Sequence, residues 1–181
     1  MVRLAIIGGS GAGKSTLARR LGAGLAVPVH HIDMMYWQNG WVVRDQQALA
    51  ALATAALEQE HWVFDGFPGR FWHSHGDNLD TLIFLDVPYF TRFWRVIKRS
   101  FKNGRHRRPD NAGNLAGLFR RKFIYNWLFG WHLKAHWRCK RLLDSAPQNV
   151  RRVHLPNAQA VEKYMAEITL KRRAQIRNKP D

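Results

Sequence analysis

The sequence predicts an α/β protein built on a doubly wound, five-stranded parallel sheet. Three observations lead to this prediction. An octapeptide at residues 8–15 fits the pattern G-x-x-x-x-G-K-[ST]. It lies between a short apolar, β-branched segment and a segment with helical spacing. Further short apolar segments then alternate with helical ones, as in parallel sheets with crossover helices. With 181 residues, 46% of them hydrophobic, the chain can build one packed core.

The first strand, the octapeptide and the first helix form one predicted unit. The strand is the apolar segment Val2–Ile7, and the helix begins with Leu17 and Leu21 four residues apart on one face. The glycines between them let the backbone turn its N–H groups inward. The first helical turn adds unpaired N–H donors and a positive dipole end. This strand–loop–helix unit is typical of a loop that wraps the phosphates of a nucleotide, and residues 8–15 are called the P-loop below.

The P-loop and the residue after it are the predicted nucleotide-binding residues. In such loops the ammonium group of Lys14 reaches the β- and γ-phosphates, and the hydroxyl of Ser15 is a ligand of Mg²⁺. We therefore predict that the chain binds ATP and Mg²⁺, with Lys14 as a catalytic residue. The predicted nucleotide-binding residues are Gly8, Gly9, Ser10, Gly11, Ala12, Gly13, Lys14, Ser15 and Thr16.

The remaining elements follow in alternation. Asp45 is a predicted N-cap, and the Gly66–Gly69 turn ends a predicted strand. The other predicted strands are Val27–Asp33, Trp62–Asp65, Thr81–Asp86 and Asn149–Leu155. Four further helices are predicted. The first runs from Asp45 to about Glu60, and the others span Tyr89–Phe101, most of 114–143, and Ala158–Ile168. We expect a single domain over residues 1–168, with a basic helical lid or insertion at about 100–145, and a frayed basic tail at 169–181.

Acidic residues end three of the predicted strands. The carboxyl ends of parallel strands meet at one edge of the sheet, where ligands bind. Asp65 is predicted to hold Mg²⁺ beside Ser15, although a turn aspartate is the alternative. Asp33, predicted to end the strand next to the P-loop, is a candidate to orient a phosphate acceptor or the metal, the alternative being a helix or turn cap. Asp86 is expected to brace the turn that follows it.

Arginines follow the fourth predicted strand. Arg95 and Arg99 are four residues apart and share a helical face. Phosphoryl transfer needs positive charge over the transferring group, which guanidinium groups supply. We therefore predict that Arg95 and Arg99 are catalytic. Arg70, directly after Gly69, is predicted to bind a phosphate of the acceptor. The alternative for these arginines is a solvated basic surface.

The net charge of +16 is concentrated in the second half of the chain. Seventeen of the 29 Lys and Arg residues lie between Arg92 and Arg152, opposed there only by Asp110 and Asp144. The positive electrostatic potential of such a region attracts polyanions, which include nucleotide phosphates, nucleic acids and acidic membranes. We therefore keep nucleic-acid binding through residues 92–152 as an alternative function. A membrane surface is less favoured, because the Trp and Arg residues of 114–143 do not separate onto two faces.

Other classes of protein are disfavoured by the sequence. A single cysteine, Cys139, makes an internal disulfide impossible. The sequence contains no run of 18 or more apolar residues, so we expect no membrane-spanning helix. We also expect no signal peptide, because the first residues lead directly into the first predicted strand. The nine histidines show no convincing metal-binding pattern; His132 and His136 are four apart but lie beside Trp131 and Trp137, which indicates packing or stacking. We expect a cytoplasmic protein.

Several of these segments together resemble known families. Asp65–Pro68, Phe84–Pro88 and Arg95–Arg99 resemble segments of adenylate-kinase-like nucleoside monophosphate kinases, whose fold is that of P-loop NTPases. A closer resemblance, over about Met1–Ile168, is to bacterial DNA topology modulation proteins, which are adenylate-kinase-related. It rests on His31–Asp33, Tyr36-Trp37, Trp41, Trp62–Gly66, Phe84–Asp86, Trp94–Arg99, Arg108–Asp110 and Phe123–Trp127.

The chain departs from that second family at two places. Phe67-Pro68 stands where the family has Asn-Tyr, and His75 stands where it tends to carry arginine. Both resemblances imply a phosphotransferase that passes the γ-phosphate of ATP to a nucleotide or another small acceptor. The alternative is a nucleotide-regulated protein that binds nucleic acid.

Overall fold

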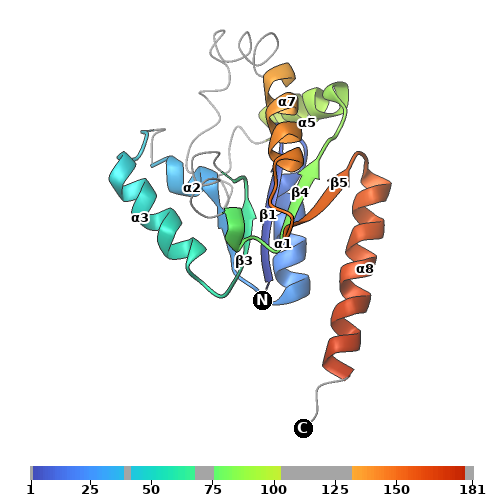
Figure 1. Ribbon diagram of the computed structural model, residues 1–181. Coiled ribbons are helices and arrows are strands. Elements are labelled where there is room, and N and C mark those ends of the chain that lie inside the picture. Colours follow the sequence, from blue (N-terminus) through green and yellow to red (C-terminus); the bar gives the residue numbers. More distant parts are fainter. Residues whose placement is uncertain (1, 39–41, 68–75, 103–131, 178–181) are drawn as a thin grey trace.

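The computed structural model describes residues 2–38, 42–67, 76–102 and 132–177, and these residues form a parallel sheet covered by helices (Figure 1). The strand order is β2-β3-β1-β4-β5, and every pairing is parallel. This confirms the predicted five-stranded sheet. The strands are β1 (Val2–Gly8), β2 (Val29–His31), β3 (His61–Asp65), β4 (Thr81–Leu85) and β5 (Arg151–Leu155).

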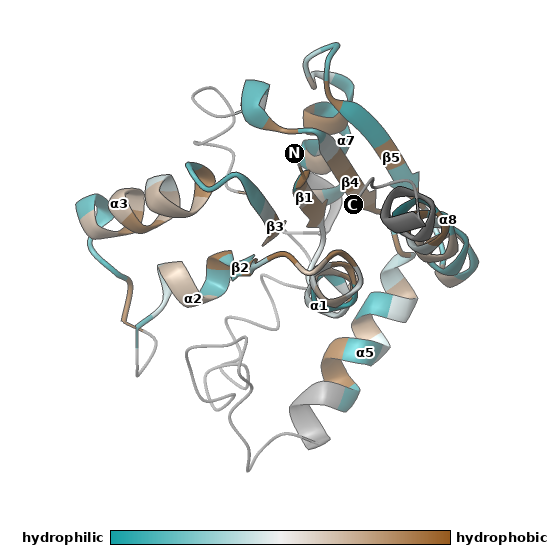
Figure 2. Ribbon diagram, turned by 90° about the horizontal axis from the view of Figure 1, so that it is seen from below, coloured by the Kyte–Doolittle hydropathy of each residue, from teal (hydrophilic) through white to brown (hydrophobic). Residues whose placement is uncertain are grey.

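Helices cover both faces of this sheet. One face packs against α1 and α8, and the other against α3 and α7, with β1 and β4 between the two layers (Figure 2). Side chains alternate along a strand, so Leu4 and Ile6 of β1 join the first layer whereas Ala5 and Ile7 join the second. The doubly wound arrangement is therefore confirmed. The helices are α1 (Lys14–Leu25), α2 (Ile32–Tyr36), α3 (Gln46–Leu57), α5 (Tyr89–Lys102), α7 (His132–Asp144) and α8 (Ala158–Arg177), with a 3₁₀ turn, η1, at Gly76–Asn78.

The central strand β1 determines where the P-loop lies on the sheet. β1 pairs with β3 on one side and with β4 on the other, in a register that sets Ile6 beside Asp65 and Gly8 beside Leu85. The chain therefore changes direction across the sheet at β1, and ligands of such folds bind outside the strand ends at that switch point. The P-loop follows β1 directly at this position. In the described part of the chain, no helix combines the length and apolar character needed to cross a membrane.

Local signals in the sequence explain several element boundaries. The carboxylate of Asp45 accepts hydrogen bonds from the N–H groups of Gln47 and Ala48 at 2.8 and 3.2 Å, so it caps α3 as predicted. α7 begins within the expected insertion, yet Cys139 and Leu142 pack against the core of the sheet. Residues 103–131, which hold the rest of the expected insertion, lie outside the described residues, so the division into domain and lid stays a prediction.

Two expectations about the elements are wrong. Asp33 does not end the strand beside the P-loop strand: β2 stops at His31, Asp33 lies in α2, and β3 separates β2 from β1. The last helix does not end at Ile168 but continues to Arg177, so most of the expected tail is helical. This extension lacks glycine and proline, and it is supported by the i,i+4 ion pair between Glu167 and Lys171 at 2.9 Å.

Candidate functional site

The backbone of the P-loop leaves the start of α1 open to an anion. Gly13 is the N-cap residue of α1, with φ of 100° in the left-handed region that favours glycine. No side chain caps the helix at this position. The N–H groups of the first turn have no partner within the helix, and they carry the positive end of its dipole. This geometry suits a phosphate group.

The side chain of Lys14 folds back over the same loop. Its Nζ donates a hydrogen bond to the carbonyl oxygen of Gly9 at 3.3 Å. The contact holds the ammonium group over the P-loop rather than out in solvent. The amine and the start of α1 therefore provide positive charge at one place, as binding of a polyphosphate requires.

Asp65 lies beside the P-loop at the end of β3. Its carboxylate is buried, with 7% of the residue exposed. The hydroxyl of Ser15 is close enough to this carboxylate to lower its pKa, so the two predicted metal ligands are together. Its Oδ2 also lies 2.7 Å from Nδ1 of His31.

These contacts keep the Asp65 carboxylate ionised. Burial alone raises the pKa of Asp65, but the hydrogen bonds from His31 and Ser15 and the charge of Lys14 outweigh burial. Its pKa therefore lies below the ordinary value of 3.8. An ionised carboxylate beside a hydroxyl is an oxygen donor set that suits Mg²⁺.

The oxygen atoms of Ser15 and Asp65 are of the kind that Mg²⁺ binds. Among the described residues, no group of three or more His, Cys, Asp or Glu side chains is placed to hold a metal ion. Mg²⁺ does not need such a cage, because it keeps several waters and binds through one or two protein oxygens and the phosphates of a substrate. Ser15 and Asp65 fit this mode.

Arginines of α5 reach the P-loop from the other side. Arg95 donates from Nη1 to the carbonyl oxygen of Ala12 at 3.2 Å, so this predicted residue lies at the loop. The side chain of Arg99 and the whole of Arg70 lie outside the described residues, and their predicted roles stay predictions. Asp33 lies in the first turn of α2, two residues beyond His31, which pairs with Asp65.

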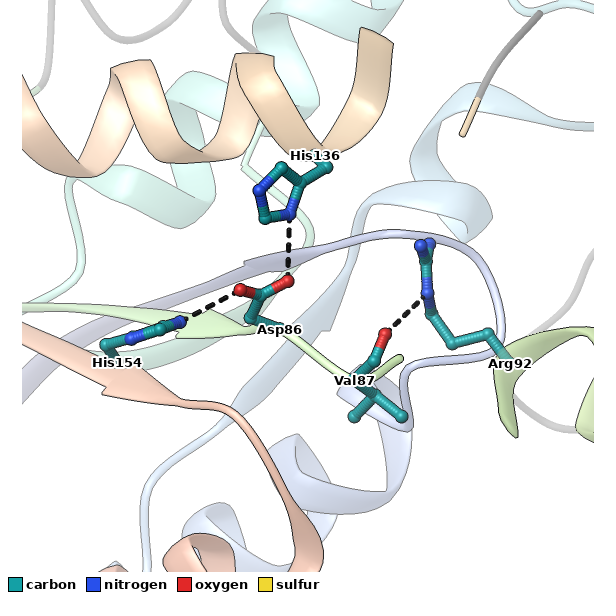
Figure 3. A network of polar contacts seen from close by, with 5 residues as sticks. All are labelled: Asp86, Val87, Arg92, His136 and His154. Atoms are coloured by element: carbon teal, nitrogen blue, oxygen red, sulfur yellow. Dashed lines mark hydrogen bonds and ion pairs between the residues drawn. The ribbon is translucent and has the colours of Figure 1, made fainter. Parts of the chain in front are cut away.

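Arg92 is a residue of the site that the sequence reasoning did not select. It is 7% exposed, and its Nε donates to the carbonyl oxygen of Val87 at 2.8 Å (Figure 3). Its guanidinium group lies against Gly9, where an added Cβ would come within 1.7 Å of Nη1. The signal in the sequence was its spacing, because Arg92 precedes Arg95 by three residues and so lies on the same helical face.

Asp86 directly follows β4 and links it to two other elements. Its two carboxylate oxygens contact Nδ1 of His136 at 2.9 Å and Nε2 of His154 at 3.0 Å (Figure 3). His136 comes from α7 and His154 from β5, so one carboxylate ties three elements together behind the P-loop. The expectation that His136 packs agrees with its ring contact to Phe84.

Cys139, one turn beyond His136 on α7, contacts the start of the P-loop. Burial raises the pKa of its thiol, although the charges of Lys14 and Arg138 and the backbone N–H of Gly8 act in the opposite direction. The thiol therefore stays protonated at neutral pH. It acts as a packing group against the core of the sheet.

Comparison with known proteins supports the fold. The sequence matches no protein-family profile and no curated protein, so the resemblance to DNA topology modulation proteins stays a prediction. Among solved structures, a deoxyadenosine kinase from M. mycoides with bound dATP matches with a TM-score of 0.53 and 16% identity, over 93% of this chain and 99% of that one.

Two further solved structures match along almost the whole chain. The same M. mycoides kinase with the products dCMP and dCDP has a TM-score of 0.50 and 16% identity, covering 96% of this chain and 99% of that one. A gluconokinase from Sinorhizobium meliloti 1021 has a TM-score of 0.50 and 14% identity, covering 98% of each chain. At these identities the likeness concerns the fold alone: this chain shares the α/β fold of these two kinases.

Proposed function

We propose that this protein is an ATP-dependent phosphotransferase that acts on a nucleotide or another small acceptor. The observation that carries the proposal is the buried carboxylate of Asp65, which interacts with Ser15 and Lys14 at the uncapped start of α1. A glycine-rich turn with only a structural role would not need a buried, ionised carboxylate next to its first helical hydroxyl. A site for a magnesium-bound polyphosphate needs this arrangement.

The residues divide the work as follows. The backbone of residues 8–13 and the first turn of α1 bind the phosphates of ATP, and Lys14 neutralises charge at the β- and γ-phosphates. Ser15 and Asp65 hold Mg²⁺, which when bound offsets the negative charge of the phosphates. Arg95 and Arg99 place positive charge over the transferring phosphoryl group.

The proposed reaction moves one phosphoryl group. An oxygen of the acceptor forms a bond to the γ-phosphorus while the bond to the β-phosphate oxygen breaks, which releases ADP. A phosphate acceptor attacks as an anion and needs no base, and Arg70 would bind such an acceptor. A hydroxyl acceptor must lose a proton, and the carboxylate of Asp33 would accept it.

An acceptor panel tests the proposal. The matched structures are named for a nucleoside kinase and for a gluconokinase, so the panel holds nucleoside monophosphates, deoxynucleosides and gluconate. We expect ADP release that depends on one acceptor class and falls by at least about 100-fold in K14A, in line with the loss of a transition-state charge contact. The matched control is K163A, an exposed lysine of α8. ATP binding without ADP release for any acceptor would remove the kinase assignment.

Nucleic-acid binding is a second candidate, favoured by one surface of α7. Trp137 is 60% exposed, and Nζ of Lys140 lies 5.8 Å from the centre of its ring. The two residues line an open hollow of about 580 Å³, together with Arg141, Asp144 and Ser145. Exposed aromatic rings among basic groups stack nucleic-acid bases and bind the backbone.

Salt dependence tests this second candidate. If single-stranded DNA or RNA binds at this surface, its affinity falls steeply with salt, and W137A weakens it by about 1–3 kcal/mol through loss of stacking. Affinity that does not depend on salt, or that W137A leaves unchanged, would count against nucleic-acid binding.

The cytoplasmic location of the protein stays part of the proposal.

A further inference from the structure

His31 and Asp65 are paired by the backbone as well as by their side chains. They are the last residues of β2 and β3, and the parallel register sets them opposite each other. Nδ1 of His31 lies 2.7 Å from Oδ2 of Asp65. Both side chains are largely buried, with 15% and 8% of their surfaces exposed.

This contact has a definite direction. A carboxylate can only accept, so Nδ1 of His31 carries the hydrogen and donates it to Asp65. The hydroxyl of Ser15 also interacts with this carboxylate and lowers its pKa. Asp65 is thus held from two sides, by β2 and by the first turn of α1.

The adjacent histidine of β2 does not share this role. Neighbouring residues of a strand point to opposite faces of the sheet. The ring of His30 contacts Phe64, which belongs to the layer of α3 and α7, and its Nε2 lies 3.0 Å from Oε1 of Gln59 in an exposed contact. His31 instead faces the side on which α1 and Ser15 lie, because its ring meets Asp65.

We propose that His31 is a positioning residue that fixes the Asp65 carboxylate beside Ser15 for the magnesium ion of Mg·ATP. This inference rests on the proposed function. A carboxylate that holds a metal needs a second hydrogen-bonding partner to set its orientation. In this chain the partner is supplied by β2, 34 residues before Asp65 in the sequence. His31 acts through Asp65 and does not touch the phosphates.

Nucleotide binding with and without magnesium tests the proposal. The affinity for ATP is measured by calorimetry in EDTA, and Mg²⁺ is then titrated at fixed ATP. In H31A we expect the half-saturating Mg²⁺ concentration to rise about 10–100-fold, the usual effect of removing such a partner. The affinity for ATP in EDTA should change less than about 3-fold, because the P-loop and Lys14 are untouched.

Two conservative variants make the test specific. Asparagine places an N–H donor near the position of Nδ1, whereas glutamine places its donor near Nε2. H31N should therefore keep most of the wild-type magnesium affinity, and H31Q should lose it as H31A does. H30A is the matched control, a histidine from the same strand whose loss should leave the magnesium titration unchanged. Thermal denaturation shows that each variant is folded.

The outcomes separate this inference from the proposed function. If wild-type protein binds no ATP, both the function and the role of His31 are refuted. If wild-type protein binds Mg·ATP and folded H31A needs no more Mg²⁺ than wild type, only the role of His31 is overturned. Equal losses of ATP affinity with and without Mg²⁺ would also overturn it, since His31 would then support the loop as a whole.

Discussion

The guanidinium group of Arg92 fills the space in which a side chain at Gly9 would lie. A Cβ atom built on Gly9 comes within 1.7 Å of Nη1 and 2.8 Å of Cζ of Arg92. Arg92 cannot withdraw freely, because it is buried and its Nε donates to the carbonyl oxygen of Val87. The shape of the P-loop therefore depends on a residue of α5 that lies 83 positions later in the chain.

The first prediction is that G9A distorts the P-loop. Overpacking a close contact costs about 1–3 kcal/mol of stability, and we expect weaker ATP binding to accompany it. The matched control is G24A in α1, where an added Cβ meets nothing within 4 Å. G24A should be neutral or stabilise the helix by up to about 1 kcal/mol. Urea denaturation and ATP calorimetry measure both effects.

The second prediction is that R92A relieves G9A in part. R92A alone loses the contact to Val87, but it also removes the atoms that G9A meets. The double variant should therefore cost less stability than the sum of the single variants, by about 0.5–3 kcal/mol, as expected of residues in contact. Additive costs in a double-mutant cycle would show that the two residues do not constrain each other.

The third prediction concerns the histidines of the Asp86 network. A hydrogen bond to a charged group contributes about 1.5–3 kcal/mol, less where solvent competes. His136 is the less exposed of the two side chains (35% against 50%), and it links α7 to this turn, whereas β5 is already paired with β4. H136A should therefore destabilise the fold by about 1–2 kcal/mol, and H154A by less.

A variant of Asp86 shows whether these losses arise from the network. In a D86N background, both histidine substitutions should cost less in urea denaturation, because the charged acceptor is gone. Unchanged costs would assign the effects to the ring contacts of His136 and His154 with Phe84.

The fourth prediction concerns Tyr164 of α8. The residue is 4% exposed, and among the residues that the structure describes its hydroxyl has no hydrogen-bond partner. An unsatisfied buried hydroxyl costs about 1–3 kcal/mol. We therefore expect Y164F to be neutral or to stabilise the fold by about 1 kcal/mol, while the ring keeps its contact with Arg151.

The buried hydroxyl of Tyr164 should also make the stability of the fold depend on pH. Burial raises the pKa of Tyr164 above its ordinary value of 10.0, with Arg151 in partial opposition. Above pH 10 the unfolded chain loses this proton before the folded chain does, so the folded state loses stability as the pH rises. Denaturation at pH 9 and 11 should show a smaller loss in Y164F than in wild type. Equal losses would mean that Tyr164 ionises alike in both states.

The grouping of the P-loop, Asp65 and Arg95 at one edge of the sheet could be predicted from the sequence, because its signals are local. The P-loop is eight consecutive residues, and Asp65 directly ends an apolar strand before Gly66. Arg95 lies at the loop because a helix after β4 begins at the same edge of the sheet.

The errors and omissions concern relations between distant segments. The predicted position of Asp33 next to the P-loop strand was wrong. β3 lies between β1 and β2, and this order in the sheet cannot be read from the order of the strands along the chain. The roles of His31 and Arg92 depend on partners 34 and 83 residues away. Spacing along one helix or strand does not show such contacts.

Detection of the transferred phosphoryl group is the decisive experiment for the proposed reaction. Wild-type protein, ATP and Mg²⁺ are incubated with each acceptor of the panel, and the products are followed by ³¹P nuclear magnetic resonance. We predict a new phosphoester or phosphoanhydride signal for one acceptor class, with an equal amount of ADP and no such signal in K14A. Release of inorganic phosphate alone, or the same signal in K14A, would refute the proposed phosphoryl transfer.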